Sequence, residues 1–336
     1  FIGFRGGVKS ANSAGPVCVA ANSTLYITNS ANLGYKGESI FLWTNAAHSN
    51  ARGKILNGGG GGGDHNAGGG GGGNYSVGGQ GGNGYNNCAA FPGGGLGGIA
   101  LSSVISGSRV FMGGGGGGGQ QNNSVSTSGG NGGGIILIKA TTLLTNTICG
   151  APISITANGQ NAANTSGGAN DGAGGGGAAG SVVLQVANFS LSATCALTVS
   201  ANGGNGGNCT TGTPHAGGGG GGQGVVIYSA AQPTLNAVTT TLGGAAGADN
   251  SGGSVSAGTG GGPNNSGVVA FVPNPLPIEL ISFEGKPTTG IVELYWKTAT
   301  EINNDFFTVE RSNNGIEFTV VGTVKANNII TTSNYQ

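Results

Sequence analysis

Side chains able to do acid–base chemistry are scarce in this chain. Of its 336 residues, 7% are charged, and the histidines are His48, His65 and His215. Over residues 1–275 the carboxylates are Glu38, Asp64, Asp171 and Asp249. Because general acid–base catalysis needs a titratable group positioned against its substrate, this composition offers almost no candidates. The sequence therefore predicts a protein that is not an enzyme and that uses no cofactor.

Asp64 and His65 are adjacent and lie directly between two glycine runs. We interpret them as a polar loop joining two glycine segments rather than as part of a catalytic pair. The same sparse carboxylates exclude a calcium-binding solenoid, which needs an Asp in each turn. No glycine run is followed by the Lys-Ser or Lys-Thr pair of a phosphate-binding loop, so nucleotide binding is not expected either.

The five cysteines are Cys18, Cys88, Cys149, Cys195 and Cys209, and none belongs to a CxxC pair. Their spacing therefore does not indicate a metal site. Cys149 and Cys195 precede Ala157-Asn-Gly and Ala201-Asn-Gly by eight and six residues in successive repeats. Because stacked repeats bring equivalent positions close together, we expect these two cysteines to form a disulfide.

The elements that must carry these groups are dominated by glycine, which accounts for 78 residues. Most glycines lie in uninterrupted runs at 58–63, 68–73, 113–119, 174–177 and 217–222. Glycine loses more backbone entropy on ordering than any other residue, so ordered runs require extensive backbone hydrogen bonding. Three structures remain open: packed polyglycine II helices with three residues per turn, a parallel β-helix with glycine turns, and a flexible spacer.

A repeat of short apolar strands accompanies the glycine runs. Aligning Ile135 with Val182, Val225 and Val268 gives steps of 47, 43 and 43 residues. A second short strand at 153–159 recurs at 197–203 and, more weakly, at 238–243. Because the segments are short, rich in β-branched residues and bounded by Gly and Asn, we expect an all-β fold with irregular parts, favouring polyglycine II helices capped by strands.

Composition divides the chain into four segments. Residues 1–131 form a glycine-rich region with irregular loops, and residues 132–272 hold the strand repeats. Residues 273–277 form a proline linker, and residues 278–336 form a more charged module with alternating strands. Over residues 1–275 there are seven Lys/Arg and four Asp/Glu, against four and seven over residues 276–336.

The last segment resembles a known module over most of its length. The matching residues are Leu276-Pro-Ile-Glu-Leu-Ile-Ser-Phe283, Val292-Glu-Leu-Tyr-Trp-Lys-Thr-Ala-Thr-Glu-Ile-Asn-Asn-Asp305 and Phe307-Thr-Val-Glu-Arg-Ser312. They are similar to the fibronectin/immunoglobulin-like module that precedes the sorting domain in proteins exported by the type IX secretion system of Bacteroidota. The resemblance implies a truncated immunoglobulin-like β-sandwich, the type IX secretion machinery as a partner, and an extracellular or outer-membrane-surface location.

The glycine-rich part resembles, in style rather than in alignable motifs, glycine-rich regions of large secreted proteins of the Bacteroidota and the polyglycine bundles of phage adhesins. We therefore expect a secreted or cell-surface structural or adhesive protein. Two alternatives stay open: a carbohydrate-binding or accessory region of a larger secreted enzyme, and a subunit of an extracellular filament.

Recognition is expected to fall to aromatic residues in the irregular loops, because glycine runs offer no side chains. The candidate ligand contacts are Trp43, Tyr75, Tyr85 and Phe91, and the expected partners are glycans or other surfaces. Zero net charge excludes nucleic acid, since no basic surface exists to neutralise phosphates. No apolar run approaches the roughly 18 residues of a transmembrane helix.

Overall fold

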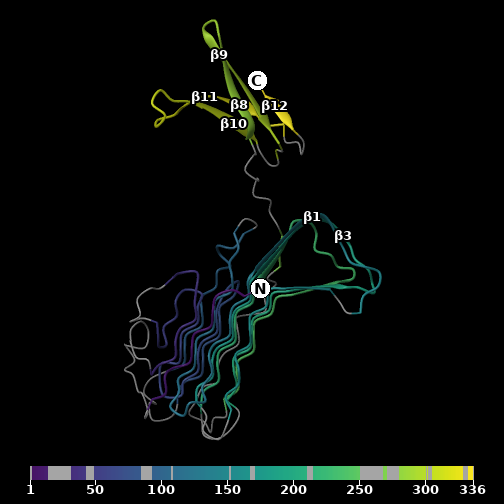
Figure 1. The fold of residues 1–336 in the computed structure, drawn as a ribbon. Helices are drawn as coiled ribbons and strands as arrows, with labels where there is room; N and C mark the ends of the chain where they lie inside the picture. The colour runs from purple at the N-terminus through teal and green to yellow at the C-terminus, as the bar shows by residue number, and fades with distance from the viewer. Residues whose placement is uncertain are drawn as a thin grey trace. The chain divides into compact units, whose positions relative to one another are not determined.

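The chain forms two compact units, Phe1–Phe271 and Val272–Gln336. The computed structural model describes residues 2–13, 32–42, 49–84, 93–106, 109–150, 153–166, 171–209, 215–249, 268–270, 280–299, 301, 305–327 and 332–335. Within these ranges every regular element is a β-strand, so the fold is all-β (Figure 1). The boundary between the units falls beside the expected proline linker 273–277, whose residues lie outside the described part.

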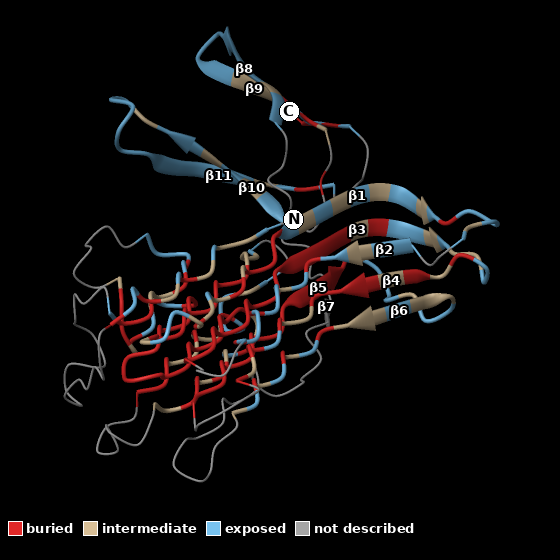
Figure 2. Cartoon of the chain, turned by 60° about the horizontal axis from the view of Figure 1, so that its bottom comes forward, coloured by how far each residue is buried: buried red, intermediate tan, exposed pale blue. Residues whose placement is uncertain are grey.

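Two parallel sheets form one end of the first unit (Figure 2). The larger has the order β1 (Ile135–Leu144), β3 (Ser181–Ser190), β5 (Val225–Tyr228) and β7 (Val268–Ala270). The smaller has the order β2 (Ile153–Thr156), β4 (Leu197–Ser200) and β6 (Ala237–Thr240). Three successive repeats contribute one strand to each sheet, as β1 and β2, β3 and β4, and β5 and β6, and β7 extends the larger sheet.

The strand register differs by one residue from the alignment made on the sequence. Ile135 pairs with Ser181, and Ser181 pairs with Val225, so aligning Val182 with Ile135 and Val225 is wrong. Val268 likewise pairs with Val226. A serine takes the position that isoleucine and valine hold in its neighbours because its hydroxyl donates to the carbonyl of Phe111 at 2.7 Å.

The core of the first unit is small and lies between the two sheets. It contains Val182, Leu184 and Val186 of β3, with Leu197 and Val199 of β4 among its other members. In Figure 2 the middle strands β3, β4 and β5 are largely buried, whereas the edge strand β1 is largely exposed. Burial of apolar side chains therefore stabilises the strands. The glycine runs have no side chains to bury, so a different interaction must hold them.

Backbone hydrogen bonds connect the glycine runs in a three-residue pattern. In the run 113–119, the N–H groups of Gly113, Gly116 and Gly119 donate to the segment 127–133. Those of Gly114 and Gly117 donate to the segment 70–73, and those of Gly115 and Gly118 to the segment 35–38, all at 2.8 to 3.1 Å. Every third residue thus faces the same neighbour.

The carbonyl groups of the run 113–119 follow the same period. They accept hydrogen bonds from three further segments, 4–10, 59–62 and 175–178. The run is therefore surrounded by six neighbours, three that it donates to and three that it accepts from. These segments run side by side in the lower half of Figure 1. We refer to this arrangement as the glycine lattice.

Glycine is required in the lattice because neighbouring backbones approach closely. A Cβ atom added at Gly117 would overlap the carbonyl oxygen of Gly60, and one added at Gly175 would overlap that of Gly70. Positive φ is not the reason, since among the described glycines it occurs at Gly290 and Gly315 in the second unit. Any side chain at such a position would push two backbone segments apart.

Cys149 and Cys195 are joined by a disulfide, with their Cα atoms 5.6 Å apart. Cys149 follows β1 and Cys195 follows β3, so the bond links equivalent connections of two successive repeats. Cys209 is buried and reduced. The remaining two cysteines, Cys18 and Cys88, lie outside the described residues.

The second unit is built from antiparallel strands. One sheet has the order β12 (Ser333–Tyr335), β9 (Ile291–Thr298) and β8 (Leu280–Thr288), and a second pairs β10 (Phe306–Arg311) with β11 (Thr319–Lys325). Trp296 is buried among aromatic rings, stacked on Tyr335 at a centroid distance of 5.2 Å and edge-on to Phe307 at 5.8 Å. These rings form the core of this unit.

Candidate functional site

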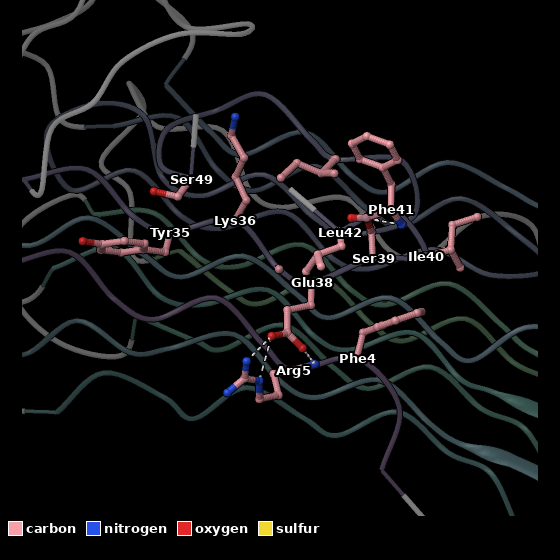
Figure 3. A pocket seen from close by; sticks show the side chains of 12 residues that line it. Phe4, Arg5, Tyr35, Lys36, Glu38, Ser39, Ile40, Phe41, Leu42 and Ser49 are labelled. Carbon is pink, nitrogen blue, oxygen red and sulfur yellow. Dashed lines mark hydrogen bonds and ion pairs between the residues drawn. The ribbon is translucent and has the colours of Figure 1, made fainter. Parts of the chain in front are cut away.

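A hollow of about 500 Å³ lies on the N-terminal part of the first unit (Figure 3). Its lining residues come from residues 4–5, from the stretch 35–42, and from Ser49 and Ile55. Backbone hydrogen bonds hold these segments together: Tyr35 donates to Val8 at 2.9 Å, and Lys36 donates to Ser49 at 2.8 Å. The hollow is thus formed by segments that the lattice keeps in register.

An ion pair lies at one side of this hollow (Figure 3). The Nε atom of Arg5 donates to Glu38 Oε1 at 2.7 Å, and the backbone N–H of Arg5 donates to Glu38 Oε2 at 2.9 Å. The hydrogen bond from Arg5 is the main cause that lowers the pKa of Glu38. Because both side chains are substantially exposed, the pair orients the two groups more than it stabilises the fold.

An apolar strip forms another side of the hollow. Ile40, Phe41 and Leu42 are 39%, 50% and 83% exposed. Their backbone is held in place, since Phe41 donates to the hydroxyl of Ser39 at 3.1 Å and Ile40 donates to Asn57 Oδ1 at 3.0 Å. Three adjacent exposed apolar side chains on a fixed turn are suited to contact a ligand or another surface.

Lys36 adds a cationic group to the lining of the hollow. Burial lowers its pKa to about 8. Among the described residues it takes part in no ion pair. The hollow therefore combines an apolar strip, a neutralised ion pair and one amine that stays largely charged at neutral pH.

Of the aromatic residues proposed as ligand contacts, Tyr75 is the one that the structure describes. It is half-buried and packs against Val183, Val225 and Ile227. Part of its ring therefore supports the strands, and its contact with a ligand stays a prediction. Trp43, Tyr85 and Phe91 lie outside the described residues, although Trp43 directly follows the exposed Leu42.

A ladder of asparagines was missed by the sequence analysis. Asn158, Asn161 and Asn164 accept hydrogen bonds through Oδ1 from the backbone N–H groups of Asn202, Asn205 and Asn208, at 2.7 to 2.9 Å. The latter three accept in the same way from Leu242, Ala245 and Ala248. We call these six asparagines the asparagine ladder. The sequence feature that could have revealed the ladder is the spacing of these residues, an Asn at every third position in two successive repeats.

A buried polar cluster ties together turns that join the glycine segments. The Asp171 carboxylate is fully buried and accepts N–H groups from Asn122, Asn123 and Val125 at 2.9 to 3.1 Å. His65 Nε2 lies within hydrogen-bonding distance of Asn122 Nδ2, at 2.9 Å. Both groups thus help to hold the loop 122–125.

Three titratable groups in or near this cluster, Asp64, His65 and Cys209, are shifted toward their neutral forms. Burial raises the pKa of Asp64 to about 7 and is the main cause that lowers the pKa of His65. Burial also raises the pKa of the Cys209 thiol to about 11. A thiol that stays protonated is a poor nucleophile. Across the described ranges, no group of three or more His, Cys, Asp or Glu side chains could hold a metal ion.

Comparisons of the chain with protein-family models, with curated proteins and with solved structures found no match. Within the described residues there is no helix of the length and apolar character needed to cross a membrane.

Proposed function

We propose that this chain is a non-enzymatic recognition segment of a secreted or cell-surface protein, with an adhesive role at the extracellular or outer-membrane surface. The observation that carries the proposal is the hollow of Figure 3, where exposed apolar side chains lie beside an ion pair and an amine. The scarcity of titratable side chains supports a binding role rather than a catalytic one.

In this proposal the rigidity of the turn that carries the apolar side chains increases the affinity of the binding surface. Ile40, Phe41 and Leu42 lie on a turn in which the Ile40 N–H donates to Asn57 of the scaffold and the Phe41 N–H donates to Ser39 of the turn itself. A rigid turn loses little conformational entropy when it binds, so more of the contact energy appears as affinity. Trp43 extends the same apolar sequence and remains our candidate for a further contact.

The glycine lattice is proposed to be a bundle of polyglycine II helices. Its support is the three-residue period of the hydrogen bonds around residues 113–119, which matches three residues per turn. The six surrounding segments fit the sideways hydrogen bonding that such helices need. A parallel β-helix fits the end of the unit that carries the two sheets. It does not fit the glycine runs, which contain no strand.

The second unit is proposed to be an immunoglobulin-like module of the kind found in proteins that the type IX secretion machinery exports. Its support is the resemblance of the sequence around Trp296, together with antiparallel strands and an aromatic core centred on that residue. In this proposal the module acts as a spacer, and the glycine lattice displays the binding surface.

The test replaces the apolar strip and measures adhesion directly. We expect the double variant Phe41→Ala, Leu42→Ala to reduce retention of the protein on alkyl-coated and glycan-coated sensor surfaces by roughly tenfold or more, since two exposed apolar contacts are lost. Adsorption at several protein concentrations gives the affinity for each surface.

The control is Leu144→Ala, which removes another exposed apolar side chain, 69% exposed, from the end of β1. It should leave retention unchanged. Equal losses for the control and the double variant would show that adsorption depends on general hydrophobicity and would contradict a specific surface at the hollow.

A further inference from the structure

We infer that the part of the asparagine ladder that lines a second hollow is a binding surface, with a short stretch of a neutral polysaccharide as its ligand. A hollow of about 540 Å³ lies on the ladder, lined by Asn161, Asn164, Asn205 and Asn208 together with Gly206 and the alanines at 162, 163, 245 and 246. Its volume is within the range of about 300 to 1,000 Å³ typical of ligand sites. This surface shares no residue with the hollow of Figure 3, so the inference does not depend on the proposed function.

The ladder fixes which end of each amide faces the ligand. Asn161 and Asn164 use Oδ1 to accept from the backbone N–H groups of Asn205 and Asn208. Those two asparagines use Oδ1 to accept from the N–H groups of Ala245 and Ala248. Because a backbone N–H can only donate, each amide must present its oxygen to the ladder. The Nδ2 group of each is then the one available to a ligand.

The four Nδ2 groups form a regular array. Along each segment the asparagines recur every third residue, which corresponds to a repeat of about 9 Å in an extended helix with three residues per turn. Adjacent segments are joined by the ladder itself. An array of donors held by backbone bonds is pre-organised, so a ligand that matches it does not have to order the side chains.

The chemistry of the lining selects the class of ligand. No lining residue is charged, so the hollow lacks the cation that an anionic ligand would need and the carboxylate that a metal ion would need. Its apolar lining side chains are alanines, so it lacks the large aromatic or aliphatic anchors of a protein interface. What remains is a neutral ligand rich in hydrogen-bond acceptors.

The alanine methyl groups in the hollow suit the apolar face of a sugar ring. Ala245 and Ala246 line the side of the hollow away from the first row of asparagines. A pyranose ring has hydroxyl and ether oxygens at its edge and C–H groups on its face. Its oxygens would accept from the Nδ2 groups while its C–H face packs on the alanine methyls. Rings bound in the hollow would lie between Asn161 and Asn164 of one row and Asn205 and Asn208 of the next.

The test uses Asn→Asp, which keeps the Oδ1 acceptor and removes the Nδ2 donor. Asn161→Asp lies in the hollow, and Asn158→Asp lies one rung outside it on the same segment. Both residues are exposed and make the same type of ladder bond, so the added charge is matched. Binding is measured by affinity electrophoresis in gels containing hydroxyethyl cellulose or dextran.

We expect at least one of the two polysaccharides to retard the wild-type protein. Asn161→Asp should weaken that retardation by roughly tenfold, as expected for a lost hydrogen bond, whereas Asn158→Asp should leave it within about twofold. Ala245→Trp fills the hollow without changing a ladder bond and should abolish retardation, with thermal melting confirming that the variant is folded. The inference is overturned if neither polysaccharide retards the wild type, if both Asp variants lose binding equally, or if folded Ala245→Trp still binds.

Discussion

The two units of this chain are held together by opposite means. In the first, neighbouring glycine backbones hydrogen-bond directly, and an added Cβ atom at Gly117 would overlap a neighbouring carbonyl. In the second, bulky side chains form the core, with Trp296 stacked on Tyr335 and edge-on to Phe307. One unit depends on the absence of side chains and the other on their presence, so adding a side chain should destabilise the first unit and removing one should destabilise the second.

The second unit also contains a buried acidic side chain, Glu301. Glu301 is fully buried, and its carboxylate accepts hydrogen bonds from Thr298 at 2.6 Å, from Tyr335 at 2.5 Å and from the backbone of Asn327 at 2.9 Å. A buried carboxylate satisfied in this way links three separate segments. In the first unit, the buried Asp171 carboxylate instead accepts hydrogen bonds from backbone N–H groups of a single loop, residues 122–125.

The largest effect is expected from adding a methyl group to the lattice. Gly117→Ala should destabilise the first unit by at least about 5 kcal/mol, because two backbone segments must separate and several hydrogen bonds are lost. Gly150→Ala is the control, since a Cβ atom there meets nothing within 4 Å. Chemical denaturation of the two variants compares them. Similar stabilities would contradict the requirement for glycine in the lattice.

Removing a large core side chain should lower the stability of the second unit. Trp296→Ala should destabilise that unit by about 3 to 5 kcal/mol, the usual loss for a large buried aromatic residue. Amide NMR spectra should then show unfolding of residues 280–335 while the glycine amides of the first unit keep their shifts. Val320→Ala, at a position 63% exposed, is the control and should change neither unit.

The disulfide between Cys149 and Cys195 should contribute to the stability of the first unit. Replacing Cys149 and Cys195 together by serine should destabilise the first unit by roughly 3 to 4 kcal/mol, because the bond closes a long loop in the unfolded chain. Thermal melting with and without a reducing agent measures this. The reductant should lower the melting temperature of the wild type but not that of the double variant.

The smallest effect concerns Asp64, whose pKa in the folded protein is about 7 against 3.8 for the free side chain. Between these values the folded state binds more protons than the unfolded state, so the stability falls as the pH rises from about 4 to 7. Asp64→Asn should remove this fall, so the variant should be the more stable protein above pH 7. His65, whose pKa is lowered, acts in the opposite direction at acid pH in both proteins. An unchanged pH profile would contradict the burial of the Asp64 carboxylate.

Much of the strand content could be predicted, because short β-branched segments bounded by glycine leave few alternatives. The strand β4 spans Leu197–Ser200, within the segment 197–203 that the repeat predicted. The register could not be predicted in the same way, since Ser181 takes a strand position through a side-chain bond to the distant Phe111. Sequence alignment favours apolar matches and cannot anticipate such a contact.

The candidate sites were harder to predict, for a physical reason. The hollow of Figure 3 joins residues 4–5 to residues 35–42 and 49–55 through backbone bonds that leave no periodic mark in the sequence. The asparagine ladder did leave one, an Asn every third residue, but its meaning depends on a three-residue period that is evident only once the lattice is known.

The central claim is that the glycine runs are an ordered lattice with three-residue periodicity, and native-state amide hydrogen exchange tests it most directly. Each N–H group of residues 113–119 donates to a neighbouring segment. The account predicts that these seven amides exchange slowly and together, with protection comparable to that of Val182 and Leu184 in β3. Rapid exchange throughout the run, alongside protected amides in β3, would show a flexible spacer attached to a small sheet and would contradict the lattice.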